Sequence, residues 1–227
     1  MTTQPTAKAV HHPIFARVYA RLSRGMEQQG TADHRRRLLA GLTGRVIEVG
    51  AGNGLNFAHY PQTVAEVVAV EPEPYLRGLA TAAARRAPVP VQVVDGTADR
   101  LPAGDGTFDA GVVSLVLCSV PDQDRALAEL LRVIRPGGEL RIFEHVRADT
   151  PGLARVQRLV DPVLPLVGGG CHASRDTLAA IAAAGFEISH YERFRFPDGR
   201  FPFPTSPHVL GVARRPSPDA SDHATTG

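Results

Sequence analysis

The stretch that decides the fold is Arg45–Gly54, read RVIEVGAGNG, an apolar run with one acidic residue that ends in three glycines at alternate positions. The β-branched residues of the run suit a buried parallel strand. The glycines allow a sharp backbone turn that a ligand can approach closely. We expect residues 55–58 to open a helix, whose unpaired N–H groups favour a ligand carboxylate or phosphate. The stretch therefore predicts a small-molecule site.

The spacing of the glycines indicates which class of ligand the loop binds. A dinucleotide-binding fingerprint has glycines at its first, third and sixth positions. Here the third glycine comes one residue early, and Leu55 stands at the sixth position. The spacing disfavours NAD, while a plain strand and loop stays an alternative because short glycine patterns are weak signals.

Composition bounds the class of protein. The chain has 227 residues, 43% of them apolar, with a net charge of +2. We expect one α/β domain and no nucleic-acid partner. The two cysteines, Cys118 and Cys171, form neither a disulfide framework nor a CxxC pair, which favours a reducing, cytoplasmic location. The longest apolar stretch, residues 110–120, is shorter than the roughly 20 residues of a transmembrane helix.

The order of elements predicts the architecture. We expect disordered tails at 1–12 and 214–227, around a single domain at 13–213. Apolar spacing predicts two helices within 13–42, either as a packing cover with the arginines at 35–37 in solvent or as a lid carrying Tyr19 over the site. Strands are expected at 64–70, 91–94, 108–118 with its following loop, 140–143, 186–194 and 208–213; helices are expected at 74–86, 122–133 and 174–185, the last capped by Ser174. This βα alternation predicts a doubly wound, mostly parallel sheet with a ligand above the strand ends.

Glu71 is the first residue outside the loop with a predicted role. It ends the second strand, 21 residues after Gly50. Doubly wound folds place an acidic residue there to accept hydrogen bonds from ribose hydroxyls. The alternative is an exposed turn carboxylate.

A series of motifs resembles class I S-adenosylmethionine (SAM) dependent methyltransferases over roughly residues 40–145. The series is VIEVGAGNG, the acid after the second strand, DGTADRLP, FDAGVVS and the IRPGG turn at 134–138. The resemblance implies a Rossmann-like seven-stranded sheet with an antiparallel C-terminal hairpin joined by 196–207. It implies SAM as cofactor and S-adenosylhomocysteine as product. The cofactor-binding residues it implies are Glu48, Gly50, Ala51, Gly52, Asn53, Gly54, Asn56, Glu71, Pro72, Thr97, Ala98, Asp99, Ser114, Leu115 and Val116; for Asp99, capping of a helical turn is an equal alternative.

A narrower resemblance covers residues 45–213. GAGNGLNFAHYP, VLCSV, EHV, DPVL, GGGCHASRDTL and PHVLGVA are similar to the methyltransferase-like protein seven group, which methylates alkyl thiols. That group has a hydrophobic membrane anchor at its N-terminus, whereas residues 1–12 here are polar, so membrane attachment is not carried over. Residues 150–173 are predicted to be a lid-like insertion hinged at a triglycine, or else a loose surface loop.

Methyl transfer from a sulfonium needs an oriented acceptor and exclusion of water. His145, at the end of the fifth strand, is the first candidate for acting on a thiol acceptor, and His172 and Tyr19 are weaker candidates. A histidine bonded within the rim of the sheet is the alternative for His145. Cys118 is expected in the core or cofactor pocket rather than as a nucleophile. No metal is expected, because the sequence has no HxxxH or carboxylate cluster.

The predicted function is SAM-dependent S-methylation of a small thiol. Methylation of oxygen or nitrogen in a small metabolite or a lipid head group is the alternative, because pocket residues rather than the fold choose the acceptor. A non-catalytic SAM-binding protein and an NAD-dependent oxidoreductase are less favoured. The sequence does not indicate an oligomeric state.

Overall fold

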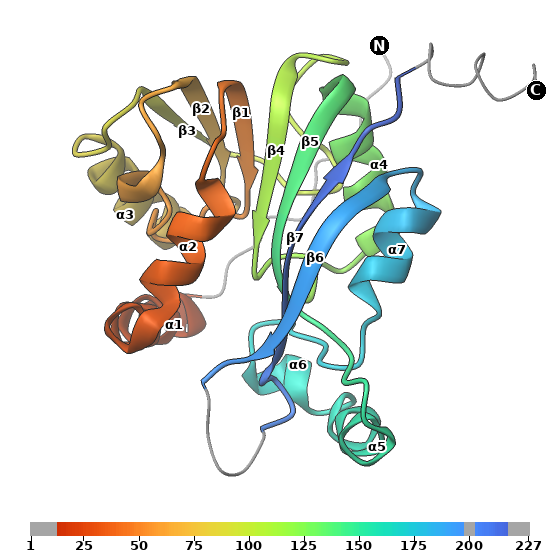
Figure 1. Cartoon of the computed structure of the whole chain (residues 1–227). Coiled ribbons are helices and arrows are strands. Elements are labelled where there is room, and N and C mark those ends of the chain that lie inside the picture. Colours follow the sequence, from red (N-terminus) through yellow and green to blue (C-terminus); the bar gives the residue numbers. More distant parts are fainter. Residues whose placement is uncertain (1–12, 198–202, 218–227) are drawn as a thin grey trace, which may run out of the picture.

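The computed structural model of the chain describes residues 13–197 and 203–217, and within them seven strands form one sheet (Figure 1). The order across the sheet is β3-β2-β1-β4-β5-β7-β6. The strands are β1 (Gly44–Val49), β2 (Val64–Val70), β3 (Val91–Val94), β4 (Phe108–Ser114), β5 (Ile134–His145), β6 (Glu187–Arg195) and β7 (Pro207–Arg214). Strands β1 to β5 are parallel, and β7 runs antiparallel between β5 and β6. The predicted doubly wound sheet with an antiparallel C-terminal hairpin is confirmed.

Helices cover both faces of the sheet. They are α1 (Pro13–Met26), α2 (Ala32–Leu39), α3 (Pro74–Ala84), α4 (Gln123–Val133), α5 (Pro151–Val160), α6 (Leu164–Val167) and α7 (Thr177–Ala183), with a π-helical turn η1 (Glu27–Thr31) and a 3₁₀ turn η2 (Phe57–His59). One core cluster joins the sheet to α4 and α7, and a second joins the other face to α2 and α3. The alternation of β1 explains this, since Ile47 belongs to the first cluster and Val46 to the second.

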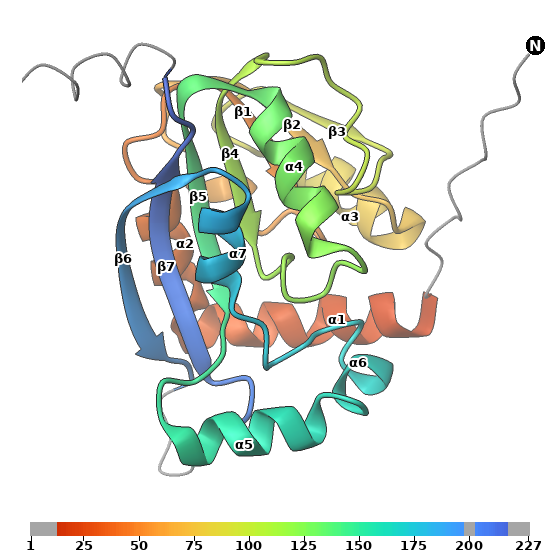
Figure 2. The ribbon, with the colours of Figure 1, turned by 90° about the vertical axis from the view of Figure 1, so that its right-hand side faces the viewer.

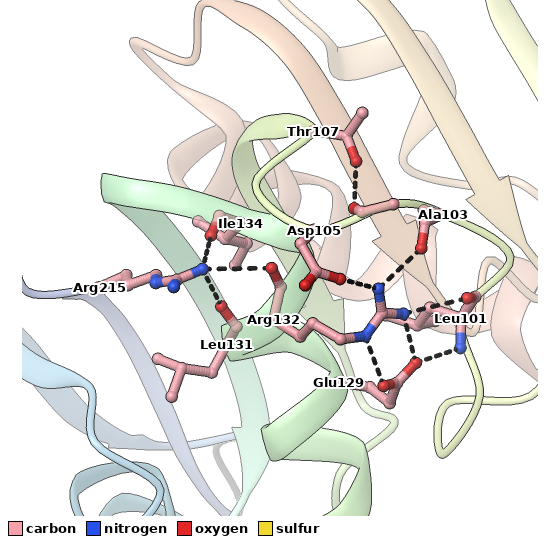
Figure 3. A network of polar contacts seen from close by, with 10 residues as sticks. Leu101, Ala103, Asp105, Thr107, Glu129, Leu131, Arg132, Ile134 and Arg215 are labelled. Atoms are coloured by element: carbon pink, nitrogen blue, oxygen red, sulfur yellow. Dashed lines mark hydrogen bonds and ion pairs between the residues drawn. The ribbon is translucent and has the colours of Figure 1, made fainter.

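The carboxyl ends of the parallel strands are the covered end of the molecule. Figures 1 and 2 place α1, α5 and α6 beyond this edge. At the opposite edge, Arg215 donates to the carbonyl oxygens of Leu131 and Ile134, at 2.6 Å each (Figure 3). These contacts satisfy carbonyls left unpaired where α4 ends. The described chain therefore continues beyond the predicted domain boundary at 213. The predicted tail at 1–12, and residues 218–227 of the predicted tail at 214–227, lie outside the described residues.

Two local predictions are wrong. No α-helix follows the glycine loop: only η2 forms, because Tyr60 precedes Pro61 and takes an extended conformation with ψ 131°. Helix α7 is capped by Asp176, which accepts a hydrogen bond from Ala179 N, and not by Ser174. In the part of the chain that the structure describes, no helix combines the length and apolar character needed to span a membrane.

Candidate active site

The glycine loop is fixed by backbone geometry. Gly50, Gly52 and Gly54 have φ values of +68°, +56° and +76°, a region that favours glycine. A Cβ on Gly50 would lie 2.5 Å from the Val116 side chain. Gly50 N and Ala51 N both donate to the carbonyl oxygen of Val70, at 2.8 and 3.1 Å. These hydrogen bonds hold the loop against the end of β2, and the polar residue that follows β2 lies beside it.

Glu71 is that residue. Its Oε2 accepts from Gly52 N at 2.7 Å, and its Oε1 accepts from Glu73 N at 2.9 Å. An ionised carboxylate has about four lone-pair sites, so two stay available to donors such as ribose hydroxyls. The carboxylate is buried rather than the exposed turn group of the alternative. Burial raises the pKa of Glu71, and its two backbone hydrogen bonds oppose that rise.

Glu48 lies beneath the loop. Its two carboxylate oxygens accept from Asn56 Nδ2 at 2.9 Å and from the Tyr60 hydroxyl at 2.7 Å. Burial raises the pKa of Glu48 to about 7, against the effect of these hydrogen bonds and of Arg35. Both oxygens are engaged by the protein, so Glu48 and Asn56 brace the loop from below.

Arg35 was not singled out by the sequence, for which arginines 35–37 in solvent were one of two alternatives. Arg36 and Arg37 are exposed, but Arg35 is buried. Its guanidinium donates to Asn56 Oδ1 at 2.7 Å and to Ser114 Oγ at 3.2 Å, and it pairs with Glu27 at 2.7 Å. Arg35 stands three and four residues before the buried Leu38 and Leu39, and this spacing puts the three side chains on one face of the helix. That is the signal that would have revealed it.

Helix α1 closes over the loop. A Cβ on Gly52 would lie 3.4 Å from Cε1 of Tyr19, so the Tyr19 ring rests on the loop. Asn53 Nδ2 donates to Ser23 Oγ at 3.1 Å. Burial raises the pKa of Tyr19, the Arg35 charge opposes this, and Glu71 and Cys118 also act on the phenol. The lid interpretation of residues 13–42 has this geometry in its favour.

A strained turn follows β4. Leu115 has φ +61°, the one positive φ of a non-glycine residue among the described residues. For such a residue the conformation costs about 1 kcal/mol or more. Buried Glu144 offsets this cost by accepting from the N–H groups of Val116 and Leu117, at 2.8 and 2.9 Å, and from that of Cys118 at 3.3 Å. Burial raises the pKa of Glu144 to about 7. No role for this carboxylate was predicted from the sequence.

The other residues with a predicted cofactor role, Pro72 and residues 97–99, lie near the carboxyl end of β2. Thr97 pairs with Arg100 across an isolated bridge, so the segment with Ala98 and Asp99 forms a tight, partly buried turn. A Cβ on neighbouring Gly96 would lie 2.9 Å from the Val70 side chain. This places the turn next to the end of β2, near Glu71 and the partly buried Pro72.

Two cysteines and His145 converge on one point. His145 Nδ1 lies 3.5 Å from Cys118 Sγ and 3.4 Å from Cys171 Sγ. The three candidate ligand atoms all lie within 4.8 Å of one another. Hydrogen bonding to the other thiol and then to His145 lowers the pKa of Cys171, while hydrogen bonding to Cys171 and then burial raise the pKa of Cys118. No metal-binding pattern is visible in the sequence because the three residues come from three separate segments.

The segment after α6 brings Cys171 to this point. His172 N donates to the Cys118 carbonyl at 2.8 Å, and a Cβ on Gly170 would lie 2.7 Å from the Ser119 carbonyl oxygen. The His172 side chain turns away to Asp161, with Nδ1 3.0 Å from the carboxylate. His172 therefore holds the insertion together instead of joining the cysteines.

The insertion is anchored rather than loose. Gln157 of α5 is fully buried and accepts from Ala148 N at 2.7 Å. Its amide donates to the carbonyl oxygens of Val146 and Pro204, at 3.2 and 2.8 Å. These bonds tie α5 to the ends of β5 and to the approach to β7, against the loose-loop alternative.

His208 is a further neighbour of His145, with no role predicted from the sequence. Its ring centroid lies 4.5 Å from that of His145, its partner in the β5–β7 register. Nδ1 donates to the Ser206 carbonyl at 2.7 Å, while the buried Nε2 has no partner among the described residues. Burial and then His145 lower the pKa of His208 to about 3. The His208 ring is therefore uncharged near neutral pH and packs against His145.

Comparisons with known proteins give the arrangement a context. Residues 47–142 match the family described as "Methyltransferase domain". The chain is 34% identical over 181 residues to "Thiol S-methyltransferase TMT1B" of Homo sapiens, covering 77% of this chain and 73% of the relative. The protein of the same name from Rattus norvegicus is 31% identical over 222 residues, with 92% and 88% covered.

A solved structure shares the fold. It is titled "Structure analysis of Geranyl diphosphate methyltransferase in complex with SAM" and superposes with a TM-score of 0.64, at 18% identity, over 88% of this chain and 90% of that one. The donor set described above fits SAM: a glycine loop that leaves room for a close approach, and a buried carboxylate with free lone pairs beside it.

Proposed function

Because this chain belongs to the family of class I SAM-dependent methyltransferases, we propose that it transfers the methyl group of SAM to the sulfur of a small thiol. The observation that carries the proposal is the likeness to thiol S-methyltransferases over most of their length, beyond the 47–142 segment shared with methyltransferases at large. That additional length includes the insertion and the C-terminal hairpin, which surround His145.

Residues of the chain have separate tasks. Gly50 to Gly54 and Glu71 hold the cofactor, with the carboxylate accepting from the ribose hydroxyls. Glu48 and Arg35 keep the glycine loop in place, and Glu144 keeps the turn after β4 in place. Tyr19 of α1 covers the loop and helps to exclude water.

SAM supplies a methyl group already activated by a positively charged sulfur. The acceptor sulfur uses a lone pair to form a bond to the methyl carbon. The bond from that carbon to the sulfonium breaks, and its electron pair stays on the sulfur of the departing S-adenosylhomocysteine. The acceptor reacts best as a thiolate, so its proton is released before transfer, and the His145 imidazole is the group beside the acceptor that is proposed to take it.

The direct test is a panel of acceptors with radiolabelled SAM. Benzyl mercaptan, benzyl alcohol and benzylamine differ mainly in the acceptor atom. We expect label in the thiol product and little in the other two. Turnover of the alcohol or amine without turnover of the thiol would remove the thiol assignment.

A second measurement separates transfer from binding. Calorimetry with SAM and with S-adenosylhomocysteine reports cofactor binding in the same preparation. Tight binding of both, without product from any acceptor, would favour a SAM-binding protein that does not transfer methyl groups.

A further inference from the structure

We propose that Cys118, His145 and Cys171 form a zinc site with three protein ligands and a fourth position that takes the sulfur of the acceptor. The presence of the metal stands on geometry alone. Its role toward an acceptor rests on the proposed function, S-methylation of a thiol.

The distances fit tetrahedral zinc. Zinc bonds to sulfur at about 2.3 Å and to imidazole nitrogen at about 2.0–2.1 Å, so two such ligands of one tetrahedron lie about 3.6 Å apart. His145 Nδ1 lies 3.5 and 3.4 Å from the two sulfur atoms. An ion between the three atoms would need only a small adjustment of the side chains.

The chemistry of the donor set selects the metal. Thiolate sulfur and imidazole favour zinc, whereas magnesium and calcium prefer oxygen ligands. Cys118 is 1% exposed and Cys171 is 8% exposed. A single imidazole nitrogen has one lone pair or one hydrogen, so it cannot make a full hydrogen bond to both buried sulfurs. One bound ion would satisfy all three ligands together.

The location suits a step beside the cofactor. Cys118 follows the turn after β4, and His145 ends β5, so both ligands lie at the carboxyl edge of the sheet, as the glycine loop does. The Tyr19 ring lies on Gly52, and Tyr19 is also influenced electrostatically by Cys118. The same helix therefore faces both the loop and the cysteines.

Three protein ligands with an open fourth position are typical of catalytic rather than structural zinc. A thiol that binds there does so as a thiolate, and its proton passes to solvent. The bound sulfur then uses a lone pair to take the methyl group. The thioether formed carries no negative charge and is a weaker ligand, which favours product release.

The first test is metal content. The full chain is expressed with zinc in the medium, passed over a weak chelator and measured by mass spectrometry. We expect about one zinc per chain. Cys118→Ser, Cys171→Ser and His145→Ala should each weaken zinc binding by more than the roughly 10- to 100-fold that loss of a residue orienting a metal ligand costs.

The matched control is His190→Ala, which removes an exposed histidine on β6. It should keep the zinc of the unmodified chain, and circular dichroism checks that every variant is folded. Absence of zinc from the folded, unmodified chain, or equal zinc in the control and in all three ligand variants, would overturn the site.

The second test uses cobalt in place of zinc, because tetrahedral cobalt absorbs visible light and its thiolate ligands add bands in the near ultraviolet. We expect benzyl mercaptan to shift this spectrum and benzyl alcohol to leave it unchanged. A thiolate spectrum that benzyl mercaptan does not alter would overturn the acceptor role.

The failures of the two proposals are distinguishable. One zinc per chain, lost in the ligand variants, without methylation of any thiol removes the proposed function and leaves the metal site standing. Undiminished thiol methylation after complete removal of zinc removes the inference and leaves the proposed function standing.

Discussion

The two halves of the sheet each hold a buried glutamate, and the two glutamates work differently. Glu48 of β1 accepts from two side chains, those of Asn56 and Tyr60. Glu144 of β5 accepts from three successive backbone N–H groups after β4. Burial raises the pKa of each carboxyl to about 7. The half of the sheet around β1, proposed to bind the cofactor, is thus braced by a side-chain network. The half around β5, proposed to bind the acceptor, depends on one carboxylate that holds a strained backbone.

This difference separates binding from transfer. The network around Glu48 and Arg35 lies beneath the loop that is proposed to hold the cofactor. Glu144 instead fixes the turn that leads to Cys118, next to His145. Substitutions in one half should therefore alter cofactor affinity, and substitutions in the other should alter turnover.

The largest expected effect is that of His145→Ala. It should lower turnover of a thiol at least about 100-fold, because the group that favours the thiolate is lost. Calorimetry should show SAM affinity unchanged, since His145 makes no contact with the glycine loop in the described residues. A parallel loss of SAM affinity would show that the halves are not separate; His190→Ala is the control.

Arg35→Met should lower the free energy of unfolding by about 2–3 kcal/mol, because it leaves Asn56, Ser114 and Glu27 without their buried partner. Urea denaturation measures the change. The exposed neighbour provides the control, since Arg36→Met should alter stability by less than about 0.5 kcal/mol. Equal effects of the two substitutions would contradict the assigned burial.

Exchanging each glutamate for glutamine tests the comparison itself. Glu144→Gln should cost about 2 kcal/mol, because the new amide N–H₂ faces backbone N–H donors. Glu48→Gln should cost about 1 kcal/mol or less, because the Tyr60 hydroxyl can reorient. Thermal or urea unfolding gives both values, and the reverse order would show that Glu48, not Glu144, is the glutamate whose second oxygen cannot be replaced by an amide nitrogen.

Glu71→Ala should weaken SAM binding about tenfold, or about 1.4 kcal/mol, because it removes the acceptor for ribose hydroxyls and frees Gly52 N. Calorimetry provides the measurement. Glu66→Ala, farther back on β2, should leave affinity unchanged; a similar loss there would assign the effect to β2 as a whole.

Stability should also depend on pH through Glu48. Burial raises its pKa from 4.5 to about 7 in the folded chain, with Tyr60, Asn56 and Arg35 opposing the rise and Glu71 adding to it. Between these values the folded chain binds a proton that the unfolded chain has lost, so stability falls as pH rises. The slope is at most about 1.4 kcal/mol per pH unit. Unfolding of the parent chain and of Glu48→Gln from pH 5 to 7 measures it, and parallel curves would exclude Glu48 as the cause.

Much of the fold was predictable from local sequence. The bounds of β2 and β3 match the expected ranges, because valine-rich runs between turn residues leave few other solutions. Two predictions failed because a residue outside the hydrophobic pattern, or packing against the sheet, determined the local structure. Pro61 stopped a helix after the loop, and Arg35 turned into the core because α2 packs against the sheet.

The candidate site was predictable in part for the same reason. Glu71 could be placed near the glycine loop because the spacing of a βαβ unit fixes their relation. Glu144, Arg35 and His208 could not, since each gains its partners from segments distant in sequence. Hydrophobic periodicity carries no information about such partners.

The sequence by itself determined the glycine loop, the succession of strands along the chain and the membership in a methyltransferase family, because these depend on local spacing. Only the tertiary structure decided that Cys118, His145 and Cys171 meet within 4.8 Å. The physical reason is that parallel strands bring their carboxyl ends to one edge, where the anchored insertion adds its own cysteine. The grouping of these three side chains therefore depends on the fold and not on any single sequence motif.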